Sequence, residues 1–185
     1  MQQERGLGRR RDVIPESIVE PSDPLWPPDL VALYAAERTE LVRAGYLICG
    51  SVAAAEDAVH DALPRVAARW PGVRQGRSYL YAAVVNAARD GARREGRAAR
   101  LFATRRDAAP APDMAASDMV ALSADSMALH SALARLPVNQ RTAIVLRYFL
   151  DWDDEAIAVH FGVRNATVRS RVHRGLVRMQ RDWKR

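Results

Sequence analysis

The hydrophobic positions near the C-terminal end of the chain follow the period of an α-helix. Val168, Val172, Leu176, Met179 and Trp183 are spaced by three or four residues and so share one side of a helix. The other sides are basic and carry Arg164, Arg169, Arg171, Arg174, Arg178, Arg181, Lys184 and Arg185. A helix with one apolar and one basic side suits the DNA major groove, where Arg reaches guanine edges and phosphates.

A second helix and a tight turn are predicted directly before this one. Gly162 can adopt a positive φ at no steric cost, so it can end the first helix and turn the chain. Ala158 offers the small side chain that a close helix contact needs, and Ile157, Phe161 and Val163 add apolar side chains. A basic helix face is often only a solvated surface. The turn, the stripe and the one-sided Arg array together favour nucleic-acid binding.

Three further amphipathic helices are predicted between residues 29 and 100. Their apolar stripes are Leu30, Leu33, Tyr34, Leu41 and Val42, then Val59, Leu63, Val66 and Trp70, then Leu80, Val84, Ala87 and Ala88. Gly50-Ser51 separates the first two helices, with Ser51 as the N-cap of the second. We expect a kink or a break at Pro64, because a proline inside a helix costs about 3 kcal/mol. Ser78 is the predicted cap of the third helix.

Two segments have the composition of unfolded chain. Residues 107–127 contain four Asp and no Lys or Arg, and we expect residues 101–126 to form a flexible acidic linker. Residues 1–28 hold five prolines and a basic cluster with no apolar stretch after it, which predicts a disordered N-terminal tail and no signal peptide. The basic cluster of this tail either binds DNA or remains exposed to solvent. The chain is therefore predicted to be all-α, with two small helical domains joined by a linker.

Charge and cysteine usage narrow the function classes. The net charge of +6 favours a polyanionic partner. A single cysteine, Cys49, excludes an intramolecular disulfide and fits the reducing cytoplasm. The four histidines are scattered and form no set at metal-ligand spacing, so we expect no metal site and no cofactor. No segment reaches the apolar length of a transmembrane helix, and we expect no membrane partner.

Three segments, in this order, resemble the extracytoplasmic-function (ECF) sigma factors of bacterial RNA polymerase. They are residues 55–66, residues 79–94 and residues 136–174. The resemblance implies sigma domain 2 at residues 29–100 and a helix-turn-helix sigma domain 4 at residues 127–185. The Ala- and Arg-rich composition is actinobacterial in character. The implied function is promoter-specific initiation of transcription by a subunit without catalytic activity of its own.

The resemblance also implies partners and the residues that bind them. The partners are core RNA polymerase, through its β′ clamp helices and β flap, and promoter DNA, with an anti-sigma factor as a further candidate. The residues that match the β′-docking patch are Glu56, Asp57, His60 and Asp61. Those that match the family's −10-binding loop and helix are Arg74, Arg77, Tyr79, Asn86, Arg89, Arg93 and Arg94. Flipping a base needs a stacking residue, and Tyr79 is the candidate.

The resemblance also implies that the basic C-terminal helix binds the −35 element. The matching residues are Arg164, Thr167, Arg169, Ser170, Arg171 and Arg174. Two other functions stay open from the residues alone. One is a stand-alone helix-turn-helix regulator that binds duplex DNA without polymerase. The other is an enzyme acting on nucleic acid, against which the chain shows no paired carboxylates, no Ser/His/Asp set and no phosphate loop.

Replacing Arg171 or Arg174 by Ala should remove discrimination at the −35 element. A bidentate contact between Arg and a base is worth about 1–3 kcal/mol of discrimination. Transcription from promoters with altered −35 sequences measures the effect. Unchanged promoter choice in both variants would show that this helix does not read the element.

Overall fold

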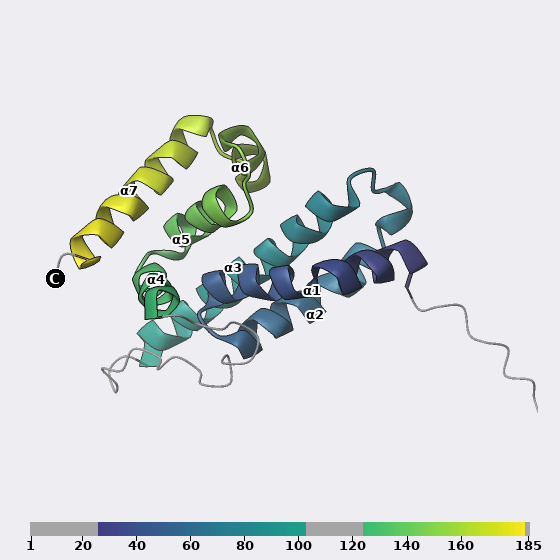
Figure 1. The fold of residues 1–185 in the computed structure, drawn as a ribbon, viewed down its shortest axis with the longest axis horizontal. Coiled ribbons are helices and arrows are strands. Elements are labelled where there is room, and N and C mark those ends of the chain that lie inside the picture. The colour runs from purple at the N-terminus through teal and green to yellow at the C-terminus, as the bar shows by residue number, and fades with distance from the viewer. Residues whose placement is uncertain (1–25, 103–123, 184–185) are drawn as a thin grey trace, which may run out of the picture.

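The computed structural model describes residues 26–102 and 124–183, and all regular structure in these two ranges is helical, which confirms the predicted all-α class. The helices form two groups along the chain (Figure 1). The first group holds α1 (Pro28–Cys49), α2 (Val52–Ala67), the 3₁₀ turn η1 (Trp70–Gly72) and α3 (Gly76–Phe102). The second holds α4 (Ala124–Ala134), α5 (Val138–Ile144), the π-helical turn η3 (Val145–Phe149), α6 (Asp154–Phe161) and α7 (Asn165–Trp183).

The first group packs α1, α2 and α3 around an apolar core. Its fully buried side chains include Leu30, Leu41, Leu63, Leu80 and Val84. The chain turns between α1 and α2 at Gly50, whose φ is 93°. The N–H of Ala54 then donates to Ser51 Oγ at 3.1 Å. The predicted cap at Ser51 is confirmed, and it satisfies one of the donors that the first turn of a helix leaves open.

Two local predictions in this group concern Pro64 and Ser78. Pro64 does not break the helix, because α2 continues to Ala67, and the kink that was the other expectation there stays a prediction. Pro64 lies in the last turn of α2, where few residues follow it and its missing N–H removes a single helical hydrogen bond. Ser78 does not cap α3, because that helix already begins at Gly76 and Ser78 lies exposed in its first turn.

The second group contains the predicted helix-turn-helix. Asp153 caps α6, since its Oδ1 accepts the N–H of Ala156 at 2.7 Å. Gly162 ends α6 in the left-handed conformation, with φ 62° and ψ 41°, as expected for a glycine at this position. Val163 N–H donates to Ala158 O at 2.9 Å and closes the turn. The buried side chains of this unit include Ile157, Val168 and Val172, which confirms the apolar side of α7.

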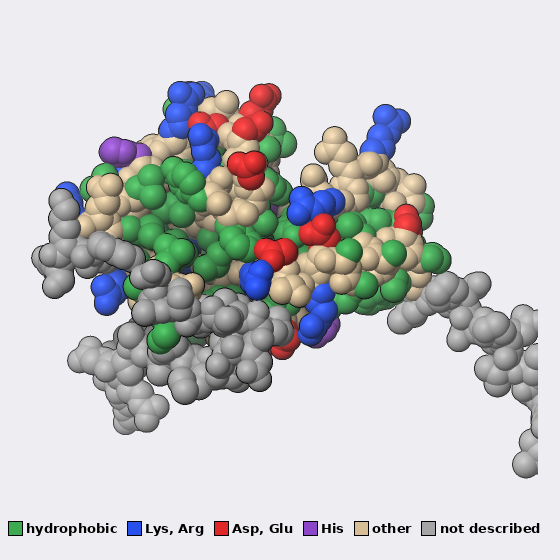
Figure 2. All heavy atoms as spheres, viewed as in Figure 1, with side chains coloured by type: hydrophobic (Ala, Val, Ile, Leu, Met, Phe, Trp, Pro, Cys, Tyr) green, Lys and Arg blue, Asp and Glu red, His purple; other side chains and the backbone are tan. Residues whose placement is uncertain are grey.

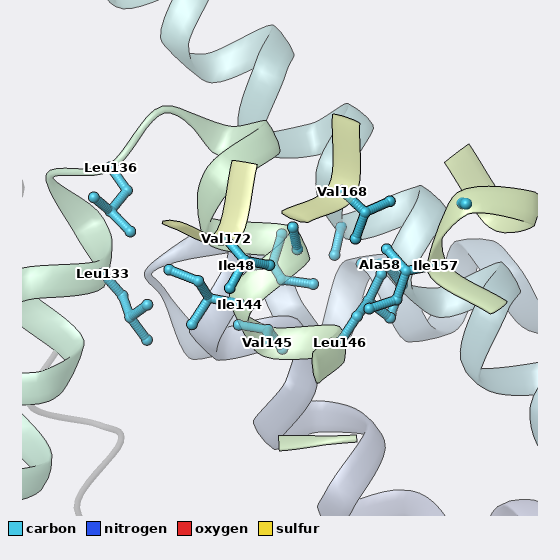
Figure 3. Packing of buried hydrophobic residues seen from close by; sticks show 14 residues of the cluster. Ile48, Ala58, Leu133, Leu136, Ile144, Val145, Leu146, Ile157, Val168 and Val172 are labelled. Atoms are coloured by element: carbon cyan, nitrogen blue, oxygen red, sulfur yellow. The ribbon is translucent and has the colours of Figure 1, made fainter. Parts of the chain in front are cut away.

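The two groups pack against each other through a shared apolar core. Ile48 of α1 and Val85 of α3 are fully buried in one cluster with Leu146 and Ile157 of the second group. Figure 3 shows Ile48 and Ala58 among the buried side chains of the second group. Residue patterns do not predict this contact, because an apolar stripe shows which face of a helix is covered but not which helix covers it.

The predicted tail and linker lie mostly outside the described residues, which exclude residues 1–25 and 103–123. At the borders the chain is helical, since α1 begins at Pro28, α3 extends to Phe102 and α4 begins at Ala124. Both α3 and α4 therefore enter the range 101–126 that was expected to be linker. Among the helices in residues 26–102 and 124–183, none combines the length and apolarity needed to cross a bilayer.

Two helical glycines provide a test of how closely the first group is packed. A Cβ added at Gly45 in α1 would lie 3.0 Å from Ala55 Cβ and 3.2 Å from Ala55 Cα, whereas at Gly96 in α3 nothing lies within 4 Å. Gly45→Val should lower the free energy of unfolding by about 1–3 kcal/mol through overpacking. Gly96→Val is the matched control and should leave it within about 0.5 kcal/mol. Urea denaturation measures the free energy of unfolding of both variants. Equal losses of stability in the two variants would contradict the close packing of α1 against α2 at Gly45.

Candidate nucleic-acid interface

The structure divides the predicted −35 residues on α7 into sets that face different directions. Thr167, Ser170, Arg171 and Arg174 are spaced by three, one and three residues and so share one face of the helix. Arg169 lies on another side, where its Nε is 3.6 Å from Asp154 Oδ2 on α6. Arg164 precedes α7 and is exposed, as are Ser170 and Arg174. On the shared face, Thr167 and Arg171 are half-buried, so only Ser170 and Arg174 are fully open to solvent.

Phe161 at the end of α6 contacts guanidinium groups from both helix groups. The Cζ of Arg171 lies 5.2 Å from the centre of its ring, and the Cζ of Arg89 on α3 lies 5.1 Å from it. Both distances are within the range of cation–π attraction. Burial lowers the pKa of Arg89, and the charge of Arg93 lowers it further. The ring thus connects a predicted −10 residue to a predicted −35 residue, a contact that the sequence did not indicate.

Arg93 is also held by the second helix group. Its Nη2 donates to Asn139 Oδ1 on α5 at 2.6 Å. Nothing in the sequence around Asn139 points to this bond, because the two residues are far apart along the chain and no motif joins them. Arg89 and Arg93, both assigned to −10 DNA from the sequence, therefore pack against α5 and α6 in this structure.

Arg77 is bound within the first group. Its Nε and Nη2 donate to the two oxygens of Glu37 at 2.8 and 3.2 Å, and Tyr81 Oη donates to Glu37 Oε2 at 2.7 Å. The hydrogen bond from Arg77 lowers the pKa of Glu37, and burial raises the pKa of Tyr81. Arg77 keeps 64% of its side chain exposed. It can therefore still meet a phosphate, while Glu37 fixes its orientation.

The remaining residues assigned to −10 DNA line two pockets. A groove of about 340 Å³ between α2 and α3 is lined by Tyr79, Asn86 and Arg94 from α3, by Asp61 and Arg65 from α2, and by Arg69 from the segment between α2 and η1. A wider cleft of about 790 Å³ lies between the loop that carries Arg74 and the segment from Asp151 to His160, with Tyr79 on its wall. The structure thus brings Tyr79, Asn86 and Arg94 together, and it places Arg74 opposite α6.

The predicted polymerase-docking residues lie along α2. Asp57, His60 and Asp61 are exposed, and their spacing of three and one residues puts them on one face. Glu56 is half-buried, and its Oε1 is 3.4 Å from Arg38 Nη2 on α1. The structure therefore keeps three of the four residues available to a partner.

Basic side chains project from separate ends of the molecule in the space-filling view. Lys and Arg side chains extend at the tip of the α2–α3 connection and near the end where α6 meets α7, and hydrophobic, acidic and further basic side chains lie between them (Figure 2). In residues 26–102 and 124–183, no group of three or more His, Cys, Asp or Glu side chains is arranged to hold a metal ion.

Comparison with known proteins identifies the family. Residues 126–179 match the family described as Sigma-70, region 4. The ECF RNA polymerase sigma factor SigL of Mycobacterium tuberculosis is 31% identical over 147 residues, which cover 77% of this chain and 81% of that protein. The chain belongs to the ECF family of RNA polymerase sigma factors. A further ECF-type relative, the RNA polymerase sigma-E factor of Streptomyces antibioticus, is 28% identical over 134 residues, 69% of each chain.

A solved structure shares the fold of this ECF sigma factor. It is the sigma factor RpoE in complex with the anti-sigma factor NepR from Bartonella quintana, with a TM-score of 0.61 and 24% sequence identity. The match covers 84% of this chain and 94% of that one. Both helix groups of this sigma factor therefore belong to the shared fold.

His160 in α6 is a neutral group beside the contact between the two helix groups. Its ring packs edge-on against Trp152 and Phe161, with centroids 5.4 and 5.2 Å away. Burial, and then the charge of Arg89, lower its pKa from 6.5 to about 4. The unfolded chain takes up the proton first as the pH falls. The stability that neutral His160 contributes is therefore present above pH 6.5 and is lost between 6.5 and about 4.

His160→Phe should accordingly flatten the pH dependence of stability between pH 6.5 and about 4, because a phenyl ring keeps the packing and does not titrate. Urea denaturation at several pH values measures the free energy of unfolding. His60→Phe, at an exposed position on α2, is the matched control. Equal slopes for the wild-type protein and His160→Phe would contradict a buried neutral His160.

Proposed function

We propose that this chain is the promoter-specificity subunit of a bacterial RNA polymerase, which binds the core enzyme and directs initiation by recognising the −35 element as duplex and the −10 element as an opened strand. The observation that carries the proposal is its 31% identity to an ECF sigma factor across 77% of the chain. A helix-turn-helix with a cationic face on α7 supports it, because that geometry suits the major groove.

Two functional domains follow from this proposal. Residues 29–100 act as sigma domain 2 and residues 127–185 as sigma domain 4, with residues 1–28 as a tail and 101–126 as the connection. Domain 2 docks on the β′ clamp helices through the exposed face of Asp57, His60 and Asp61. The carboxylates on this face suit a partner with exposed arginines. Domain 4 contacts the β flap.

The −10 strand is held on α3 and its preceding loop. Tyr79, Asn86 and Arg94 line one groove with Arg65 and Arg69, so a base and its phosphate can be bound there together. An aromatic ring stacks on any base, and Arg adds charge-assisted contacts to the phosphate. Arg74 extends the cationic surface into the loop. Arg77 also binds the −10 strand, as do Arg89 and Arg93 once they are released from their contacts within the protein.

The −35 duplex is read by the shared face of α7. Arg171 and Arg174 reach base edges, and Thr167 and Ser170 make shorter contacts to bases or phosphate. Arg164 lies at the start of the helix, where it meets the phosphate backbone. Arg169 is tied to Asp154, so it orients α6 and α7 as well as adding charge.

The protein has no catalytic role in this proposal and works in the cytoplasm, where the polymerase is. An anti-sigma factor is a candidate regulator, because the solved relative of the same fold was crystallised with one. A stand-alone regulator is the second function to test, since helix-turn-helix units also bind duplex DNA without polymerase.

Run-off transcription with sigma-free core polymerase tests the proposal. The reaction uses genomic promoter fragments of the host, with and without this protein, and Asp57→Arg as a variant that reverses a charge of the docking face away from the −10 groove. The wild-type chain should give start sites that depend on it. Asp57→Arg should weaken core binding and reduce the yield without changing which promoters are used.

The other outcomes separate the alternatives. Tight binding to duplex DNA with no binding to core polymerase would identify a stand-alone regulator. Core binding without dependent start sites on any fragment would contradict promoter recognition. Dependent start sites that are insensitive to Asp57→Arg would move the docking face away from this part of α2 but leave the function in place.

A further inference from the structure

Glu37 of α1 holds an arginine that the proposed function assigns to the −10 strand. Arg77 Nε and Nη2 donate to its two carboxylate oxygens at 2.8 and 3.2 Å. A guanidinium group has five N–H groups, and these two bonds use one of its edges. The edge formed by Nη1 and the second Nη2–H stays open, on a side chain that is 64% exposed. Arg77 can therefore bind a ligand there without leaving Glu37.

The carboxylate of Glu37 is itself anchored in the core of the first helix group. Tyr81 Oη donates to Glu37 Oε2 at 2.7 Å, and Tyr81 is only 2% exposed. The ring of Tyr81 also lies against Arg77, whose Cζ is 5.0 Å from the centre of the ring. The Glu37 side chain is 19% exposed, so the pair has its anion toward the protein and its cation toward solvent. Arg77 is therefore held from two sides, by a carboxylate and by a ring.

The backbone at the start of α3 is also closely packed. A Cβ added at Gly76 would lie 2.6 Å from a ring carbon of Trp70 in η1. The N–H of Tyr79 donates to Gln75 O at 3.0 Å and closes the first turn. Arg77 thus starts from a fixed backbone position, and the contact with α1 fixes its guanidinium group. A side chain that is ordered before binding loses less conformational entropy when it binds.

The ion pair changes what Arg77 can recognise. The hydrogen bond from Arg77 lowers the pKa of Glu37, and the same bond raises the pKa of Arg77, so both groups are charged at neutral pH. The pair has no net charge, so it attracts a phosphate less than a lone arginine does. Its open edge still presents parallel donors in a fixed direction. Two adjacent acceptors on a base, such as guanine O6 and N7, match these donors.

We propose that Glu37 is a positioning residue, which makes Arg77 the reader of one guanine in the opened −10 strand instead of a general phosphate contact. This role rests on the proposed function, because Arg77 must meet the −10 strand for Glu37 to act through it. Glu37 itself touches no DNA. Its loss should have two opposite effects, namely weaker discrimination between bases and higher affinity for any strand. Both effects arise because Arg77 becomes mobile and its charge is no longer offset.

Three substitutions separate the position of Arg77 from its charge. Glu37→Gln removes the charge of the carboxylate and keeps the size of the side chain. Glu40→Gln is the matched control, because it makes the same charge change one turn further along α1, where the carboxylate binds Arg43 at 2.6 Å. Arg77→Lys keeps the cation but loses the edge with two parallel donors. Urea denaturation checks that each variant is folded before binding is compared.

The experiment measures binding of labelled single strands to the holoenzyme assembled from core polymerase and this chain. The strands carry the −10 sequence of a promoter mapped by run-off transcription, with each position changed in turn to the other three bases. At one position the wild-type protein should prefer guanine over adenine by about fivefold or more. Glu37→Gln and Arg77→Lys should bring this ratio toward one at that same position. Glu40→Gln should keep the wild-type ratio.

The salt dependence of binding separates a positioning role from a purely structural one. In Glu37→Gln, affinity for a strand without the preferred guanine should rise. The slope of log K against log salt should steepen by about 0.7, which corresponds to one added phosphate contact on a single strand. A Glu37 that only stabilised the fold would instead lower affinity for every strand when replaced. In an Arg77→Ala background, Glu37→Gln should not reduce base discrimination further, because the residue it positions is gone.

Wild-type base ratios at every position in Glu37→Gln would overturn the inference. So would an equal loss of affinity for all strands, or the same loss of discrimination in Glu40→Gln. The proposed function is judged separately, by start sites that depend on the protein. If these start sites appear and Glu37→Gln keeps the wild-type ratios, only the role of Glu37 is wrong. If no dependent start sites appear, the proposed function and the role of Glu37 both fail.

Discussion

The arrangement of this protein depends on the apolar contact between α1–α3 and α5–α6. Ile48 and Val85 are fully buried by residues of the second helix group, so each group completes the core of the other. Arg141 adds a hydrogen bond from α5 to the last turn of α1. The position of α7 relative to α3 follows from these contacts, because α6 and α7 form a unit closed by Gly162 and Val163. These contacts therefore set how the candidate DNA-binding residues on α3 and on α7 lie relative to each other.

Arginine serves two purposes in this arrangement. A guanidinium group can stack on an aromatic ring and bind an amide, and it can equally bind a base or a phosphate. Arg89 and Arg93 make the first kind of contact here, with Phe161 and Asn139. The same residues are the ones proposed to bind the −10 strand. Interactions that stabilise the folded chain and interactions proposed for the promoter thus compete for the same atoms.

Much of the local structure could be predicted from the sequence. The stripe on α7, the left-handed Gly162 and the Ser51 cap depend on neighbours within one or two helical turns, and all three are confirmed. Of the kink or break expected at Pro64, the break is absent, because a proline in the last turn interrupts little of the helix. The bond between Arg93 and Asn139 could not be predicted, because it depends on how distant helices pack. The polymerase and DNA contacts themselves stay predictions.

The packing of the two helix groups against each other through a shared apolar core is the feature on which the account depends. The most direct test is the distance between spin labels at Ala53→Cys on α2 and Gln180→Cys on α7, both exposed positions, in a Cys49→Ala background. The packing predicts a single, narrowly distributed distance between the two labels in the free protein. A broad distribution of distances would contradict it.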